Sequence, residues 1–221
     1  MDDHDDVFVS LEGIDGTGKT GVAKRLETEL RALGLDPLVT HDPPAIEPWR
    51  RFKSEILDKE TEVSSPAEAM LYFSGRLDNV LRFIVPALEA GRVVVADRFT
   101  DSWIAYQTLK LEPFFGSREA ATGWLRDFSQ TFLEHGMYVA PGKTYLIVDT
   151  PEEAVQRAAE KGPTKWEKAD FLAEVQRIYL RLAHAEPDRF EVFDIHNRAI
   201  DGAIDEIVEV AVEYIGQRVR V

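Results

Sequence analysis

The chain of 221 residues contains no cysteine. Disulfide bonds and thiolate nucleophiles are therefore excluded, and the composition fits a reducing cytoplasm. The sequence also has no apolar run as long as the roughly 18 residues that a membrane-spanning helix needs, so no such helix is predicted. Its opening, MDDHDD, is acidic where a signal peptide would be basic, and it predicts a flexible tail over residues 1–6.

Positive charge is also scarce. The lysines and arginines number 26 against 40 aspartates and glutamates, which gives a formal net charge of −14. Binding to nucleic acid depends on basic residues that neutralise phosphates, so this balance argues against DNA or RNA as a partner. An anionic small-molecule substrate would have to be captured by a local basic pocket within a repelling field.

Residues 13–20 fit the phosphate-binding pattern G-x-x-x-x-G-K-[ST]. A β-prone segment at 7–11 precedes them, and the apolar spacing over 21–33 predicts an amphipathic helix after them. In such a strand–loop–helix unit, backbone amides and the helix N-terminus surround an anion. Lys19 would reach the β- and γ-phosphates of a nucleotide, and the Thr20 hydroxyl would ligate Mg²⁺. The residues predicted to bind the nucleotide here are Gly13, Ile14, Asp15, Gly16, Thr17, Gly18, Lys19 and Thr20.

Five β-prone runs alternate with helical patterns along the chain. They lie at 7–11, 37–40, 92–97, 144–149 and 190–194. This alternation predicts an α/β fold, a doubly wound five-stranded parallel sheet flanked by helices, in a single domain over 1–221. Residues 108–142 are less regular, with one helical stretch near 118–134, and we interpret them as an insertion.

A second group of candidate residues follows a predicted buried strand. The apolar run from Val93 ends in Asp97, and Arg98 comes next. In a doubly wound sheet the carboxyl ends of the strands line the ligand crevice, so Asp97 and Arg98 are predicted to face the same crevice as Lys19. Asp97 would hold Mg²⁺ directly or through water, and Arg98 would clamp a phosphoryl group.

The helix predicted from Pro66 places Tyr72, Arg76 and Asn79 on one face. A ring one turn away from a guanidinium suits a planar heterocycle, because the ring stacks on it and the arginine bonds to a carbonyl edge.

In this order, the features resemble the thymidylate kinase family of P-loop nucleoside monophosphate kinases. The likeness covers roughly residues 7–107 and 143–215. It rests on FVSLEGIDGTGKT, MLYFSGR, VVADRF with the following Ser102, Ala105, Tyr106 and Gln107, TYLIVDTPEEAVQRA, YLRLA and DRFEVFDI. The resemblance implies a P-loop kinase fold and transfer of the γ-phosphoryl group of ATP to dTMP, with Mg²⁺. It also implies that Asp15 organises metal or water near the acceptor phosphate and that Arg98 bridges the acceptor and donor phosphates.

The resemblance further implies an acceptor pocket. Tyr72 takes the place of an aromatic residue that stacks on thymine, and Arg76 that of an arginine that bonds to a base carbonyl. Tyr106 would lie against the deoxyribose, where its bulk disfavours a 2′-hydroxyl. Four further residues are assigned to this pocket by position: Asp42, Lys53, Ser102 and Gln107.

Residues from about 160 to 169 fall where the family has its mobile lid. A lid excludes water and brings cations over the transferring phosphoryl group. Because no residue at positions 14–17 is basic, the resemblance implies that Lys161 and Lys165 supply this charge. Family members are usually homodimers, and the apolar faces of the helices over 66–90 and 100–107 are the expected interface.

Some residues depart from the family pattern. His41 and Lys53 stand where arginine is common, and Trp103 stands where a small or polar residue often touches the base. These changes leave open a kinase of another deoxynucleotide or of a deoxynucleoside. A nucleotide-dependent switch protein is a further alternative, although the only trace of its N-K-x-D guanine motif is TKWE at 164–167.

Overall fold

The computed structural model describes residues 7–57, 63–159 and 169–219, with the side chains of residues 53, 56 and 57 left aside. The predicted tail over 1–6 and the predicted lid from 160 to 168, which holds Lys161 and Lys165, lie outside the described residues. Within the described ranges, no helix is both long and apolar enough to cross a membrane.

The centre of the fold is a five-stranded, all-parallel sheet, as predicted. Its strands lie within two residues of the predicted runs: β1 (Phe8–Glu12), β2 (Leu38–His41), β3 (Val94–Asp97), β4 (Lys143–Val148) and β5 (Phe190–Asp194). The order across the sheet is β2-β3-β1-β4-β5. Strand β1 therefore lies between β3 and β4, and the chain winds outward from it in both directions. Such a reversal of direction opens a crevice at the carboxyl ends of the central strands.

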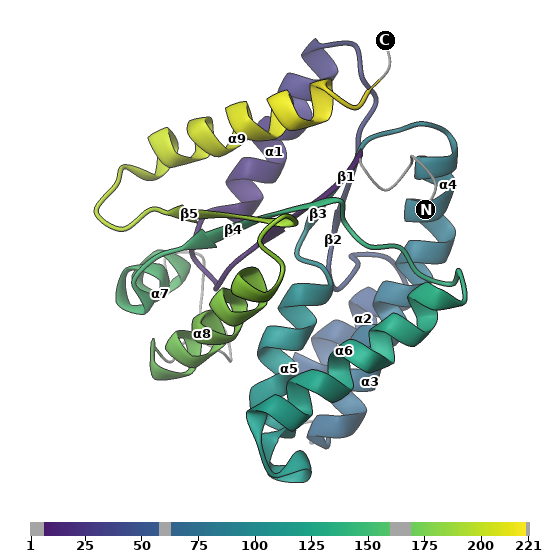
Figure 1. Ribbon diagram of the computed structural model, residues 1–221, viewed down its shortest axis with the longest axis vertical. Helices are drawn as coiled ribbons and strands as arrows, with labels where there is room; N and C mark the ends of the chain where they lie inside the picture. The colour runs from purple at the N-terminus through teal and green to yellow at the C-terminus, as the bar shows by residue number, and fades with distance from the viewer. Residues whose placement is uncertain (1–6, 58–62, 160–168, 220–221) are drawn as a thin grey trace.

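Helices cover both faces of the sheet, which confirms the doubly wound α/β fold. Figure 1 shows α1 (Lys19–Ala32) and α9 (Ile200–Gly216) on one face and most of the other helices on the opposite face. Each face of the sheet has its own hydrophobic core, and successive side chains of β1 point to opposite faces. Phe8 packs into one core, and Val9 and Leu11 pack into the other. This burial on both faces explains why the strands are continuously apolar rather than alternating.

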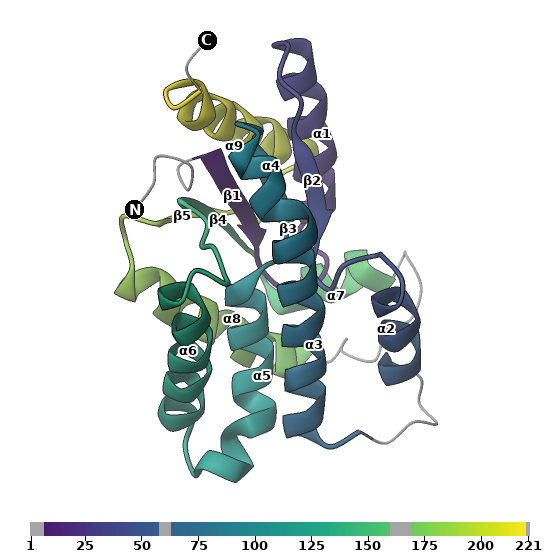
Figure 2. The same ribbon diagram turned by 90° about the vertical axis from the view of Figure 1, so that its right-hand side faces the viewer.

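The larger helical layer carries the segment predicted to bind the acceptor. Helix α3 (Ser65–Asn79), one π-helical turn (Val80–Ile84) and α4 (Val85–Glu89) follow one another without a break, and Figure 2 shows them as one long rod. Helix α2 (Trp49–Leu57) precedes this rod, and α7 (Pro151–Ala159) and α8 (Ala169–Ala185) follow β4.

The segment 108–142 is more regular than predicted. Its first eight residues complete α5 (Thr100–Phe115), and α6 (Arg118–Glu134) confirms the predicted helical stretch. The reversal between the two helices is made by Gly116, which has a φ of 77°, and by Ser117, whose side chain accepts a hydrogen bond from the backbone of Ala120. The proline at 113 misled the prediction because a single proline is tolerated here in the last turn of α5.

Helix α5 is buried on more than one side. Trp103, Ile104 and Ala105 are at most 4% exposed, and they pack within the chain. The apolar side chains at 103–105 are therefore already covered and do not support the predicted contribution of residues 100–107 to a dimer interface, whereas Phe114 and Phe115 at the end of the same helix are 62% and 37% exposed.

Candidate active site

The phosphate-binding loop lies between β1 and α1 and depends on its glycines. Gly13, Gly16 and Gly18 have φ values of 141°, 89° and 91°, which residues with side chains rarely adopt. A Cβ atom on Gly13 would lie 2.3 Å from the carbonyl oxygen of Ile147, and one on Gly16 would lie 1.9 Å from that of Ala154. The loop is therefore pressed against β4 and α7, and only glycine fits at both positions.

Lys19 folds back over this loop. Its ammonium group donates hydrogen bonds to the carbonyl oxygen of Ile14 at 2.6 Å and to the Thr17 hydroxyl at 3.3 Å. Burial, followed by the nearby Arg98 cation, lowers the pKa of Lys19 to about 7, against the opposite effect of Asp15, Asp97 and Glu12. A polyanion in the loop would favour the charged form, so the site is suited to take up phosphate together with a proton.

Thr20 and Asp97 meet at the mouth of the loop. The Thr20 hydroxyl donates a hydrogen bond of 2.7 Å to Oδ2 of Asp97. Asp97 reaches this position because β3 pairs with β1 in a register that places it beside Leu11. A hydroxyl and a carboxylate are the oxygen donors that Mg²⁺ prefers, so the pair fits the predicted role.

Arg98 sits beside the same loop in a strained backbone conformation. Its φ is 72°, which is unusual for a residue other than glycine and typical of functional sites. Its guanidinium donates to Oδ1 of Asp15 at 2.6 Å, to the Gly13 carbonyl at 2.9 Å and to the Ser102 hydroxyl at 3.0 Å. The side chain thus spans from the phosphate loop to α5.

Asp15 connects this cation to Tyr106. The Tyr106 hydroxyl donates to Oδ2 of Asp15 at 3.3 Å, and the Arg98 guanidinium lies 5.3 Å from the centre of the Tyr106 ring. Burial raises the pKa of Asp15, but the Arg98 and Lys19 cations outweigh it and lower the pKa to about 2. Asp15 is therefore ionised at neutral pH and holds the guanidinium in place.

Arg76 and Asp42 form a buried ion pair next to this cluster. The Arg76 side chain is 1% exposed, and its Nε atom donates to Oδ2 of Asp42 at 2.8 Å. The guanidinium lies 5.7 Å from the Phe99 ring centre and 5.5 Å from that of Trp103. The aromatic pair and the carboxylate fix the guanidinium among apolar groups.

The acceptor-side residues also contain polar atoms without partners. Within the described part of the chain, Nη1 of Arg76, Oδ1 of Asp42 and Oε1 of Gln107 are buried and make no hydrogen bond. Unsatisfied buried polar atoms are uncommon and call for an explanation such as a ligand. Tyr72 is half-buried nearby, and the charges of Asp42 and Asp15 reinforce the effect of burial in raising its pKa.

The structure thus brings together most of the predicted residues. Trp103, which departs from the family pattern, has a packing role, and the assignment of Lys53 stays a prediction. Trp103 is buried, and its indole N–H donates to the Ala69 carbonyl at 2.9 Å, so it packs α5 on α3. Lys53 lies in α2, but its side chain is outside the described atoms.

A family model described as thymidylate kinase matches residues 11–207. The chain belongs to the thymidylate kinase family. It is similar to the thymidylate kinase of Deinococcus radiodurans, with 38% identity over 85% of this chain and 88% of the relative. It is also 36% identical to the thymidylate kinase of Desulfovibrio desulfuricans, over 85% and 87% of the two chains. A probable thymidylate kinase of Methanosarcina acetivorans is 34% identical over 85% and 86%.

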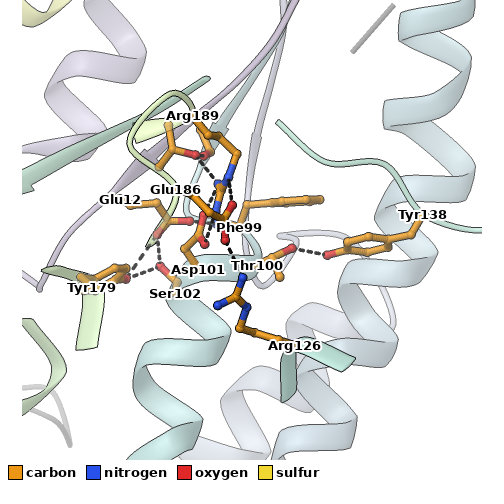
Figure 3. A network of polar contacts seen from close by, with 12 residues as sticks. Glu12, Phe99, Thr100, Asp101, Ser102, Arg126, Tyr138, Tyr179, Glu186 and Arg189 are labelled. Atoms are coloured by element: carbon orange, nitrogen blue, oxygen red, sulfur yellow. Dashed lines mark hydrogen bonds and ion pairs between the residues drawn. The ribbon is translucent and has the colours of Figure 1, made fainter. Parts of the chain in front are cut away.

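Sequence reasoning missed two residues at the site of this thymidylate kinase family member. Glu12, at the end of β1, is fully buried and accepts hydrogen bonds from the backbone of Phe99 and from two hydroxyls (Figure 3). A carboxylate directly before the loop glycine was a signal that could have drawn attention to it. Tyr179 carries one of those hydroxyls, and its place in the apolar stripe of α8 gave no functional signal.

Arg157 is a further cation at the site, and the sequence already places it just before the predicted lid. Its Nε atom donates to the Gly16 carbonyl at 2.9 Å, and the same side chain pairs with Asp149. It brings a cation to the outer side of the phosphate loop.

Proposed function

We propose that this protein transfers the γ-phosphoryl group of ATP to dTMP, giving ADP and dTDP. The observation that carries this proposal is that Lys19 and Arg98 approach one loop, since Lys19 binds the carbonyl of Ile14 and Arg98 binds that of Gly13. Two anionic ligands held by these cations would meet end to end, as phosphoryl transfer requires.

The donor is held by the loop amides and Lys19, with Thr20 and Asp97 placed to hold Mg²⁺. When bound, the metal neutralises charge on the transferring phosphoryl group. Arg157 adds a cation on the donor side of the site. We assign the same role to Lys161 and Lys165. No protein nucleophile is needed, because the acceptor phosphate itself attacks. The protein's contribution is positioning and charge neutralisation.

Arg98 would take the acceptor phosphate on one side and the transferring group on the other. Asp15 orients that guanidinium through its 2.6 Å hydrogen bond. In this arrangement Tyr106 lies against the sugar and Tyr72 stacks on the base. Arg76 and Asp42 provide the polar groups of the pocket that face the edge of the base. The buried atoms of Arg76, Asp42 and Gln107 that lack hydrogen bonds support this assignment.

Acceptor selectivity tests the proposal. A coupled assay of ADP release, with dTMP, dUMP, dCMP, thymidine and the ribose form of TMP, should give the highest kcat/KM for dTMP. Tyr106 should make the ribonucleotide at least about 10-fold poorer, the scale of one misfit group in a packed pocket. Thymidine should not be phosphorylated, because it brings no phosphate for Arg98.

The other outcomes of this assay identify the alternatives. A higher kcat/KM for another deoxynucleotide than for dTMP would identify that deoxynucleotide as the acceptor. A higher kcat/KM for thymidine than for dTMP would indicate a deoxynucleoside kinase. Hydrolysis of GTP with no dependence on any acceptor would indicate a switch protein and contradict the proposal.

We also propose that the protein acts as a homodimer in the cytoplasm. The rod of α3, the π-helical turn and α4 leaves Leu81 of that turn 47% exposed, and an interface on this face would cover it. For a chain of 25.0 kDa, sedimentation at micromolar concentration should give about twice that mass. A monomer that is fully active at assay concentration would contradict it.

A further inference from the structure

We propose that Glu12 is a positioning residue for phosphoryl transfer, which orients the Arg98 guanidinium through the hydroxyl groups of Ser102 and Tyr179. This inference rests on the proposed function, because it concerns the cation that is assigned to the acceptor phosphate. Among the described residues, Glu12 makes no hydrogen bond with Arg98. The two charges attract each other through space, and the hydroxyls between them set the direction of the hydrogen bonds to the guanidinium.

The two oxygens of Glu12 have different partners. Oε1 accepts a hydrogen bond of 2.8 Å from the backbone N–H of Phe99. Oε2 accepts from the Ser102 hydroxyl and, at 3.2 Å, from the Tyr179 hydroxyl. Figure 3 shows these partners converging on the Glu12 carboxylate from α5 and α8.

The same two hydroxyls accept hydrogen bonds from Arg98. Its Nη1 atom lies 3.0 Å from the Ser102 oxygen and 3.3 Å from the Tyr179 oxygen. A hydroxyl has one proton and two lone pairs, and a carboxylate can only accept. The two hydroxyl oxygens also lie 2.6 Å apart, so one hydroxyl can donate to the other. With Glu12 ionised, each hydroxyl proton has an acceptor that is not Arg98, and the remaining lone pairs are left to face the guanidinium.

Replacing the carboxylate by an amide reverses this arrangement without changing its size. In Glu12→Gln, the Phe99 N–H requires the amide oxygen at the Oε1 position, so the NH₂ group takes the place of Oε2. The amide then donates two protons to the hydroxyls, and the number of protons in the cluster exceeds the number of acceptors. At least one O–H group must then turn toward the guanidinium or lose its partner.

The surroundings place the ionisation of Glu12 near neutral pH. Burial, followed by the Asp101 carboxylate on α5, raises its pKa to about 7, against the opposite effect of Ser102, Arg98 and the Phe99 N–H. Asp101 is held in turn by two hydrogen bonds, of 2.8 and 2.9 Å, from Arg189. Lys19 of α1 is the remaining charged neighbour, and its own charge is favoured by Glu12. A proton on Oε2 would likewise make this position a donor toward the hydroxyls, with one proton where the amide has two.

The test compares Glu12→Gln with the wild-type protein in the dTMP kinase assay at pH 8. A misdirected hydrogen bond to a charged group should lower kcat about 10- to 100-fold, while KM for ATP changes less than about threefold. The deficit should shrink toward pH 6, because the wild-type carboxyl becomes protonated there. Taking the ratio of the two proteins cancels the ionisation of the substrate phosphates. Because Glu12 favours the charged form of Lys19, a loss of charge on Lys19 in the variant would show separately, as a raised KM for ATP.

A double-mutant cycle assigns the effect to Arg98. In an Arg98→Ala background, Glu12→Gln should change kcat by no more than about twofold. Glu68→Gln is the matched control, since Glu68 is a buried carboxylate that pairs with Lys110 away from Arg98, and it should keep kcat within about twofold. If Glu12→Gln does not fold, removal of both hydroxyls in Ser102→Ala/Tyr179→Phe should reproduce the loss of kcat.

Three results would overturn the inference: a kcat for Glu12→Gln within threefold of wild type, an equal effect with and without Arg98, or a deficit that is the same at pH 6 and pH 8. Failure of the proposed function looks different, because the wild-type protein would then show no dTMP-dependent turnover.

Discussion

Replacing Arg98 by alanine should lower kcat by about 10³-fold or more, the range found for arginines that stabilise a transferring phosphoryl group. Arg98 connects the Gly13 carbonyl, Asp15 and Ser102, so its loss removes the one described cation that faces both the phosphate loop and the acceptor side. Lysine should recover little of the rate, because it cannot reproduce the fork of the guanidinium.

The controls for this variant concern charge and folding. Arg25 on α1 is 54% exposed and pairs only with surface carboxylates, so Arg25→Ala should leave kcat unchanged. Circular dichroism should show that Arg98→Ala retains its secondary structure. A folded Arg98→Ala protein with near-normal turnover would refute the assigned role.

Replacing Arg76 by leucine should destabilise the protein by about 3–5 kcal/mol, because it leaves the buried Asp42 carboxylate without its partner. Both side chains of the pair are at most 6% exposed, so water cannot take the place of the guanidinium. Urea unfolding followed by fluorescence would measure the change in the free energy of unfolding.

The loss should depend on pH in a defined direction. Burial raises the pKa of Asp42 more than Arg76 lowers it, so without Arg76 this pKa would rise further and the folded state would keep a proton that the unfolded state releases. A carboxyl with a raised pKa makes stability fall as pH rises above the ordinary value. The deficit of Arg76→Leu should therefore be larger at pH 8 than at pH 5.

A double variant separates charge from packing. Asp42→Asn/Arg76→Leu no longer buries an unpaired carboxylate, so it should be more stable than Arg76→Leu alone by about 1 kcal/mol or more at pH 8. If the two variants are equally unstable, the cost comes from the lost packing of Arg76 on Phe99 and Trp103 rather than from the charge.

The parts of the site that the sequence predicted best are local in the chain. The loop at 13–20 follows one strand and opens one helix, so its glycines and Lys19 could be assigned from neighbouring residues alone. The pairing of Thr20 with Asp97 required one further rule, that parallel strands place their carboxyl ends at a common edge. Both depend on patterns that a single stretch of sequence contains.

The parts that were missed join distant segments. Tyr179 reaches Glu12 across 167 residues, and Arg76 reaches Asp42 across 34. The apolar stripe of α8 is the same whether its tyrosine lines a site or only fills a core. The sequence also did not predict that α5 stays helical to its end or that Trp103 is buried. Both depend on the packing of α5 against α3, α6 and α8.

By itself, the sequence determined the order of strands and helices, the phosphate loop and the side chains that carry charge, because these follow from local periodicity and from glycine conformation. Only the tertiary structure decided which charges become partners, that Arg98 adopts a left-handed backbone, and that a buried carboxylate lies behind it. The reason is physical: burial in one shared interior sets the pKa values and the direction of each hydrogen bond, and that interior is built from segments far apart in the chain.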